Sequence, residues 1–510
     1  MVFALTVTNL LAQLSPDRFT QLLNQPSLLS LKLSSPAKVK SFYALYNYQF
    51  AWLVSSSHPV NVLTQYLLHS TEWGLSNEDY QPVLVRSILD KTFSPATEAD
   101  SFLAEIKLTD AAIHFFEDVL RGNESLTLSY NGLNYMSDCY NTPQLLAVYL
   151  SDNRLEFLLN DAESKEPEYI AVKQKLKAFS QQVSQLNFKD AKIISDKISP
   201  ANKPLVERLF QLGIFDADTT HLTTEIVKNK VKEAEELFGL LKDGLLRKTF
   251  LQAANVPLRY RIKELSYTLN TIRRLNCIKQ TGHTVVVNIP SATLLLYAKG
   301  KVILESRIIV GKPSTKTPTL SSRITEVILY PYWNVPFKIA TTELLPVIKR
   351  NRGYLNENNF QVLDNAGRVV DPAKVNWRAL SAAYFPYTIR QSTGCDNSLG
   401  LIKLNFYNPF SVYLHDTPYK LLFKSYRRFY SHGCMRVERA MEVGRYLLKG
   451  NEIAIDTLED KGCLNNQQPI IVPAAEAIPV FVLYNTAWFD SSGRVVLYGD
   501  VYEKMKAILK

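Results

Sequence analysis

The sequence predicts an α+β protein of several domains: a mainly helical N-terminal domain, a second small helical domain, and a β-rich domain with a lid-like insertion. Three observations predict this class. The chain has 510 residues, enough for three or four domains. Apolar residues make up 46% and charged residues 21%, which is typical of a globular chain. The hydrophobic periodicity changes from helical to strand-like near residue 280.

Residues 1–195 are predicted to form the helical N-terminal domain. Between Ser101 and Arg121 apolar residues recur at a roughly helical period, and Gly122 follows as a stop. Further helices are predicted at 18–32, 37–56, 60–70, 141–151 and 166–186. Residues 196–277 are predicted to form the second helical domain, with helices at 205–210, 223–238, 245–254 and 257–275.

Residues 278–470 read as the β-rich domain. Lys299-Gly300-Lys301 is predicted as a hairpin tip. Strands are predicted at 283–290, 293–297, 302–310, 324–330, 386–391, 401–406, 411–416 and 453–456. The segment 340–385, with a helix over 342–350, interrupts the sheet and is interpreted as a lid over a groove, with a merely decorative insertion as the alternative. The tail, 471–510, is predicted to add two strands and a last helix.

Charge and hydropathy narrow the classes of function. The net charge is +10, but no dense Lys/Arg run is present, so nucleic-acid binding is not predicted. No apolar stretch reaches 18 residues, so no transmembrane helix is predicted. Residues 2–14 resemble a signal-peptide core but lack a basic leader and a cleavage site; a leader and a first helix both remain open.

The chain has five cysteines: Cys139, Cys277, Cys395, Cys434 and Cys463. None form a CxxC pair, and five of the histidines are isolated, so no metal site and no cofactor are predicted. The odd count leaves at least one thiol free, and Cys434 is the candidate. The other four are expected to be small buried residues, and pairing of Cys395 with Cys463 is left open.

Cys434 ends the run Ser431-His432-Gly433-Cys434, nineteen residues after His415. A thiol is a good nucleophile only as thiolate, and a nearby imidazole or a helix N-terminus favours that form. Gly433 permits a sharp turn beside the sulfur. The amphipathic stretch that follows predicts that the sulfur lies just before a helix start.

The motif resembles that of the L,D-transpeptidases, whose YkuD-type catalytic domain carries His, then about fifteen residues, Ser/Thr-His-Gly-Cys, and Arg two positions on. His415, Ser431 to Cys434 and Arg436 fill those places. Strands 283–310, the Tyr332–Pro336 run and the Tyr484–Trp488 run resemble the long multidomain subgroup. The resemblance implies that 1–195 is that subgroup's scaffold domain and 196–277 a peptidoglycan-binding-like domain. Met435, and Ser392 to Asp396, depart from the family pattern.

The resemblance implies a catalytic role for four residues. Cys434 is the nucleophile, and His415 is the base that takes the thiol proton and later protonates the leaving amine. His432 and Gly433 shape the oxyanion site, with a purely structural role as the alternative for His432.

Four further residues are expected at the substrate. Arg436 binds a carboxylate or forms a structural ion pair, and Tyr413 lines the groove or packs in the core. Asp416 orients His415 or caps a turn. Ser431, in the motif itself, is expected to contact substrate.

The implied activity is formation of 3→3 cross-links between peptidoglycan stem peptides in the cell envelope, with the periplasm as the expected compartment. Water as acceptor would make the enzyme an L,D-carboxypeptidase, and another amine would attach proteins. A non-catalytic wall-binding scaffold is a third hypothesis. The acceptor, the third stem residue and the oligomeric state stay open.

Overall fold

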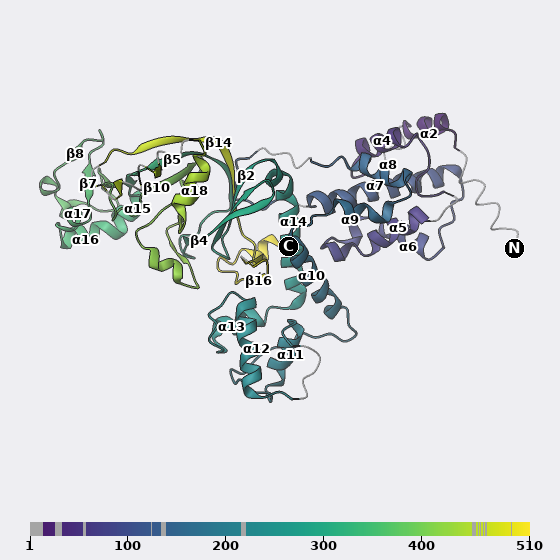
Figure 1. Ribbon diagram of the computed structural model, residues 1–510, viewed down its shortest axis with the longest axis horizontal. Coiled ribbons are helices and arrows are strands. Elements are labelled where there is room, and N and C mark those ends of the chain that lie inside the picture. The colour runs from purple at the N-terminus through teal and green to yellow at the C-terminus, as the bar shows by residue number, and fades with distance from the viewer. Residues whose placement is uncertain are drawn as a thin grey trace.

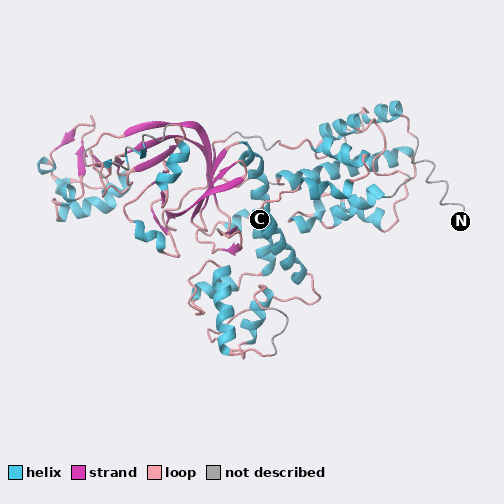
Figure 2. Cartoon of the chain, viewed as in Figure 1, coloured by secondary structure: helices cyan, strands magenta, loops and turns pink. Residues whose placement is uncertain are grey.

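The computed structural model describes residues 14–25, 33–54, 58–123, 125–133, 139–215, 221–450, 455–456, 458, 461–462, 464, 467–490 and 492–509. The β-rich part lies at one end of an elongated molecule and a helical bundle at the other (Figure 1). Helices α11 (Lys203–Gln211), α12 (Thr224–Leu237) and α13 (Lys248–Ala254) project from the middle. The predicted combination of a helical N-terminal region and a β-rich C-terminal region is confirmed (Figure 2).

The N-terminal bundle surrounds the long helix α7 (Glu98–Arg121), which starts with a capping box of Thr97 and Asp100. Glu105, buried on α7, accepts the backbone N–H groups of Ala51 at 2.6 Å and Leu53 at 3.0 Å. The helix expected over 37–56 was therefore predicted too long, because these amides bond to a carboxylate instead of continuing the helix. The other helices are α2 (Pro16–Leu23), α4 (Pro36–Leu45), α5 (His58–Leu68), α6 (Pro82–Leu89), α8 (Thr142–Ser151) and α9 (Leu158–Ala162).

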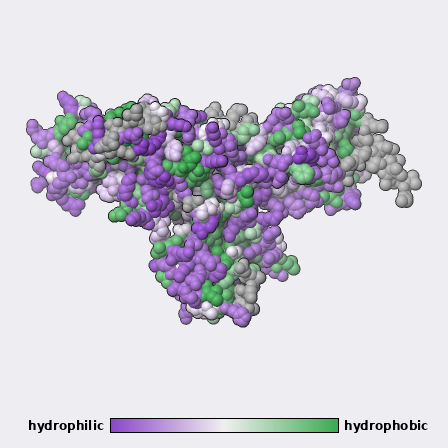
Figure 3. Space-filling view, in the orientation of Figure 1, coloured by the Kyte–Doolittle hydropathy of each residue, from purple (hydrophilic) through white to green (hydrophobic). Residues whose placement is uncertain are grey.

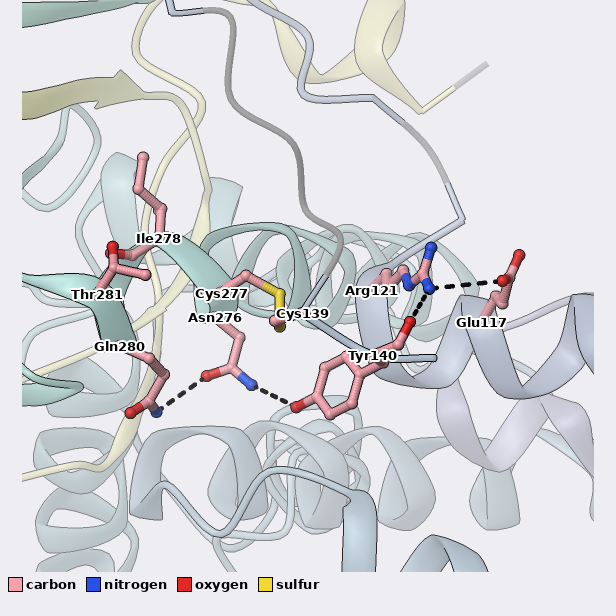
Figure 4. The surroundings of a disulfide bond; sticks show 9 residues. All are labelled: Glu117, Arg121, Cys139, Tyr140, Asn276, Cys277, Ile278, Gln280 and Thr281. Carbon is pink, nitrogen blue, oxygen red and sulfur yellow. Dashed lines mark hydrogen bonds and ion pairs between the residues drawn. A yellow bond between two sulfur atoms is a disulfide. The ribbon is translucent and has the colours of Figure 1, made fainter. Parts of the chain in front are cut away.

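The segment between the bundle and the rest of the protein is attached at two points. Strand β1 (Tyr130–Asn131) pairs in parallel with β5 (Leu320–Leu329). Cys139 forms a disulfide with Cys277 on α14 (Leu258–Thr281), 138 residues away in sequence (Figure 4). The expectation that these two cysteines are unpaired was wrong, because the linker brings their Cα atoms to 5.6 Å. Cys395 is also disulfide-bonded, and Cys463 lies outside the described residues.

Helices α10 (Pro167–Val183) to α14 share a core with the large sheet. Leu209, Val231 and Leu269 share one hydrophobic cluster with Val286 and Phe481 from the large sheet. Strands β15 (Ala487–Phe489) and β16 (Val495–Leu497) complete this cluster through Trp488 and Leu497. The helical unit therefore packs on one face of the sheet.

The large sheet closes on itself, because β14 pairs with both β2 and β5. Its interior holds a core that includes Leu296, Leu404, Leu414 and Met435. The other strands are β2 (His283–Asn288), β3 (Thr293–Ala298), β4 (Lys301–Gly311), β10 (Ile402–Phe406), β11 (Leu414–His415), β12 (Phe429–Ser431), β13 (Met435–Val437) and β14 (Ile470–Leu483). Helices α18 (Ala440–Leu447) and α20 (Met505–Ile508) pack against this core.

Three expectations about this domain were wrong. The strand expected over 411–416 has only two residues, and in place of the strand expected at 453–456 the two described positions, 455 and 456, are helical. The helix expected directly after Cys434 starts six residues later, at Ala440. Strand β13 intervenes, because Arg436 and Val437 pair with β4.

The insertion in the sheet is a compact unit with its own core around Trp377, Ile348 and Val362. The helix expected over 342–350 is present as a π-helical turn (Ala340–Leu344) followed by α16 (Leu345–Arg350). The remaining elements are β6 (Trp333–Asn334), α15 (Phe337–Ile339), α17 (Tyr354–Glu357), β7 (Phe360–Leu363), β8 (Val369–Val370) and β9 (Thr388–Gln391).

The surface seen in Figure 3 is mostly hydrophilic, with small separate hydrophobic patches. Within the described residues, every helix is too short or too polar to cross a lipid bilayer. The apolar segment 2–14 lies almost entirely outside those residues.

Candidate active site

Three adjacent strands, β10, β11 and β13, hold the residues of the predicted site. Lys403 pairs with His415, and His415 pairs with Arg436. Because side chains alternate along a strand, Leu404, Leu414 and Met435 belong to the core, and Lys403, His415 and Arg436 lie on the outer face. Tyr413 and Cys434 directly precede β11 and β13, and Cys434 also packs against the edge of the core. The structure thus brings together four residues that the sequence predicted and adds Lys403, which sequence reasoning missed.

Cys434 carries a free thiol and is half-buried. Its Sγ donates to the Ser411 carbonyl oxygen at 3.9 Å. Burial raises the pKa of the Cys434 thiol, whereas hydrogen bonds with Tyr413 and the charges of Lys403 and Arg436 act to lower it. No helix dipole contributes, since β13 follows the sulfur.

The loop before Cys434 is held by internal hydrogen bonds. The Ser431 hydroxyl donates to the Cys434 carbonyl oxygen at 2.5 Å and accepts the Gly433 N–H at 3.1 Å. Thr317 donates to the Gly433 carbonyl oxygen at 2.8 Å. Gly433 has a φ of +121°, which a residue with a Cβ rarely adopts. Ser431 is buried, so in this structure it supports the loop from inside.

His415 is buried, and its Nδ1 lies 2.5 Å from the carbonyl oxygen of Asp416. A carbonyl accepts only, so Nδ1 carries the proton, and Nε2 of the neutral ring is unprotonated. Burial and then the charge of Arg436 lower the pKa of His415 to about 3, against the opposing effects of the Asp416 and Leu399 carbonyls. The ring is therefore neutral at physiological pH.

The carboxylate of Asp416 makes different contacts. It accepts from Lys420 Nζ and from the Leu401 N–H at 3.1 Å. A Cβ on Gly400, whose φ is +63°, would lie 2.3 Å from Asp416 Oδ2. Asp416 thus orients His415 through its backbone, while its side chain fixes the adjacent turn.

Arg436 and Tyr413 border the sulfur from two sides. The Arg436 guanidinium lies 5.9 Å from the centre of the Tyr419 ring, and burial lowers its pKa. In the described part of the chain, no carboxylate lies within ion-pair distance of Arg436, so the structural ion pair weighed for it is not found there. The Tyr413 ring lies 5.6 Å from the His415 ring, centre to centre, at a 65° interplanar angle.

His432 connects the motif to the insertion. Its Nε2 lies 2.8 Å from Oε1 of Glu343, and both side chains are partly exposed. Glu343 stands in the π-helical turn of the insertion, a kind of local irregularity that is frequent at functional sites. The contact joins the insertion to the loop that carries Cys434.

A cavity of about 750 Å³ lies elsewhere, between the α9–α10 connection, α14 and the β3–β4 hairpin. Glu166, Asn276 and Lys301 are among its lining residues, and none of the residues predicted for the site lines it. Over the described ranges, no three His, Cys, Asp or Glu side chains cluster closely enough to hold a metal ion.

Comparison with known proteins identifies two parts of the chain. Residues 282–455 match the family model described as the L,D-transpeptidase catalytic domain, YkuD, and residues 37–176 match the model described as the scaffold domain. A putative L,D-transpeptidase of Haemophilus influenzae is 38% identical over 230 residues, which are 45% of this chain and 46% of the relative. The match therefore spans about half the length of that relative.

Two solved structures show a weaker likeness. One is an L,D-transpeptidase from Mycobacterium smegmatis, 14% identical, with a TM-score of 0.19 over 39% of this chain and 58% of that one. The other is the Ldtfm-avibactam carbamoyl enzyme, 14% identical, with a TM-score of 0.18 over 53% of this chain and 84% of that one. Neither likeness carries further weight. From its sequence matches, the chain contains a YkuD-type L,D-transpeptidase catalytic domain at residues 282–455, joined to a scaffold domain at residues 37–176.

Proposed function

We propose that the protein is an L,D-transpeptidase that forms 3→3 cross-links in peptidoglycan through a thioester on Cys434. The observation that carries this proposal is the free thiol of Cys434 on one sheet face with His415, Tyr413 and Arg436, inside the matched catalytic domain. The sulfur attacks the carbonyl carbon of the third residue of a tetrapeptide stem, and the terminal D-alanine leaves. A side-chain amine of a second stem then attacks the thioester and releases the sulfur. No step requires a cofactor.

His415 is proposed as the proton carrier. Its Nδ1 donates to the Asp416 carbonyl, which leaves Nε2 as the acceptor. A neutral imidazole takes a proton from the attacking group and delivers one to the departing amine. Tyr413, whose hydroxyl contacts the sulfur, keeps the thiol oriented in this scheme.

The oxyanion donors are proposed to be the N–H groups of Cys434 and His432, with Gly433 as the turn that aims them. The Gly433 N–H itself is engaged by Ser431 Oγ. Neither of the two proposed N–H groups donates to another group among the described residues. Arg436, without an ion-pair partner there, is the proposed ligand for a stem carboxylate.

The insertion and the other domains are proposed to support the catalytic domain. We propose that the insertion, 340–385, is a lid over the groove, supported by the contact of Glu343 with His432. Residues 1–195 are the scaffold domain, 196–277 a peptidoglycan-binding-like unit, 278–470 the catalytic domain and 471–510 the tail. The Cys139–Cys277 disulfide favours an oxidising compartment, in keeping with a periplasmic enzyme.

The test is incubation with disaccharide-tetrapeptides, followed by mass spectrometry. Cross-linked dimers from the wild type, and none from Cys434→Ala, are the expected result. Tripeptides without dimers would identify an L,D-carboxypeptidase, which uses the same residues with water as acceptor. A carbapenem is expected to add its mass to the wild type and not to Cys434→Ala. If the folded wild type shows neither the adduct nor turnover, the hypothesis of a non-catalytic wall-binding scaffold is favoured.

A further inference from the structure

We infer that Lys403 is a positioning residue which, together with Arg436, supplies the positive charge opposite the Cys434 thiolate, in place of a histidinium. This inference rests on the proposed role of Cys434 as nucleophile. It goes beyond that role, since it assigns a function to Lys403 and fixes the charge state of His415 in the resting site. It predicts that the thiolate, when it forms, faces a neutral imidazole, while burial keeps the pKa of the Cys434 thiol raised overall.

The placement of Lys403 is the first support. Its Cα is the register partner of His415, and its Nζ lies 4.2 Å from the centre of the Tyr413 ring. At that distance the ammonium is attracted to the face of the ring. In the described residues Lys403 has no ion-pair partner. The carboxylate whose charge acts on it, that of Glu326, accepts a hydrogen bond from Asn405 at 2.6 Å. A half-buried ammonium without a carboxylate partner is costly, so its retention calls for another anion.

The sulfur is the anion that its surroundings offer. Tyr413, on which Lys403 lies, is hydrogen-bonded to Cys434. The charge of Lys403 lowers the pKa of Cys434, and a charged Cys434 is the largest opposing influence to the burial that lowers the pKa of Lys403. The two groups therefore stabilise each other's charged forms.

The same cations act on His415 in the opposite sense. Arg436 and Lys403 both lower the pKa of His415, which burial has already lowered, to about 3 overall. A positive charge beside the pair favours the thiolate and disfavours the imidazolium. When the S–H bond breaks in the resting site, the electron pair stays on sulfur and the proton passes to solvent; a proton taken from solvent by His415 Nε2 is later delivered to the departing amine.

Other charged groups near the sulfur are already paired. His432 faces Glu343, and the Asp416 carboxylate faces Lys420. On the neighbouring strand β5, the carboxylate of Glu326 acts on the charge of Lys403. Lys403 and Arg436 are thus the cations left to oppose the thiolate among the described residues.

The experiment measures the rate of iodoacetamide alkylation of Cys434 against pH, in the full chain with its disulfides intact and with Cys434→Ala as the labelling blank. Lys403→Met is expected to raise the alkylation midpoint by about one pH unit or more, and so to slow alkylation about tenfold below it. Lys403→Arg keeps the charge and is expected to stay near the wild-type midpoint. Lys301→Met, which removes an exposed lysine at the β3–β4 hairpin, is the matched control and is expected to change nothing.

A second variant tests the neutral histidine separately. His415→Gln is expected to leave the midpoint where it is or lower it, whereas loss of an imidazolium partner would raise it. Such a rise, or an unchanged midpoint in folded Lys403→Met, would overturn the inference. If Lys403→Met does not fold, Lys403→Gln replaces it with the same two outcomes. Alkylation needs no turnover, so failure here is distinguishable from failure of the proposed cross-linking activity.

Discussion

Removal of the Cys139–Cys277 disulfide is expected to lower the stability of the junction between the bundle and the sheet. The bond closes a segment of 138 residues that contains α8 to α13. Its neighbours form a polar network: Asn276 donates to the Tyr140 hydroxyl at 3.1 Å, and Arg121 donates to the Tyr140 carbonyl (Figure 4). Changing both cysteines to serine removes the covalent link and keeps this network.

The magnitude follows from the length of the closed segment. A cross-link lowers the entropy of the unfolded chain by an amount that grows with the logarithm of that length. For a separation of 138 residues the chain-entropy relation gives about 5 kcal/mol at 25 °C. The double variant is therefore expected to lose up to about 5 kcal/mol from the free energy of unfolding of the joined helical cores.

Urea unfolding followed by tryptophan fluorescence measures the loss. Trp52 lies in the bundle core and Trp488 lies in the core shared by the helices and the sheet. The fluorescence therefore reports unfolding on both sides of the junction. The alkylation midpoint of Cys434 serves as the internal control and should not move, because β10, β11 and β13 belong to another core. A double variant with the wild-type urea midpoint would refute the reasoning.

Three further changes test other parts of the structure. Gly400→Ala should abolish cross-linking and lower the melting temperature, because φ is +63° and the new Cβ would lie 2.3 Å from Asp416 Oδ2; a wild-type melt and wild-type activity would contradict this. Burial raises the pKa of Glu105 to about 7 from 4.5, so the folded state binds the proton more tightly and stability is lost as pH rises through that window, by about 3 kcal/mol. Unfolding of Glu105→Gln measured from pH 4.5 to 7 should show a flatter profile, and an unchanged slope would count against the assignment. Glu343→Gln weakens the contact with His432 by up to about 1 kcal/mol and should raise KM for the stem peptide more than it lowers kcat; an effect confined to kcat would argue against a lid.

The sequence predicted the longer regular elements well, because their periodicity is set by burial on one side. The strands at 283–288, 293–298 and 301–311 and the helix ending at Arg121 are confirmed. Elements fixed by partners far along the chain were missed. Residues 470–479 of β14 belong to the sheet because they pair with β5, and their own pattern contains two prolines.

The start of α18 shows how two patterns compete. From Val437 to Leu448 the apolar spacing suits a helix, and sequence reasoning extended that helix back to Cys434. Strand pairing of β13 with β4 and β11 takes Met435 to Val437 instead. A three-residue strand is too short for alternation to be recognised in the sequence.

Within the site, residue types in a tight motif were predictable and their contacts were not. Gathering of Cys434, His415, Tyr413 and Arg436 on one face follows from the pairing of β11 with β13, which spacing alone does not reveal. In the sequence Lys403 is a lysine at an alternating position of a predicted strand. Its position beside His415 follows only from the register of β10 with β11. Which oxygen of Asp416 contacts His415 likewise depends on the folded backbone and not on the spacing of the motif.

The low pKa of His415 suits attack of the acceptor amine on the thioester better than formation of the thioester. Burial disfavours both the thiolate and the imidazolium, so an ion pair between Cys434 and His415 would be opposed from both sides. Lys403 and Arg436 reduce this opposition for the sulfur alone, and the pKa of the Cys434 thiol stays raised overall. Once the sulfur is acylated it carries no charge, and among the groups that act on the pKa of His415 only the backbone carbonyls of Asp416 and Leu399 favour its protonated form. The ring then stays neutral until an acceptor amine attacks, when the free Nε2 takes the proton of that amine.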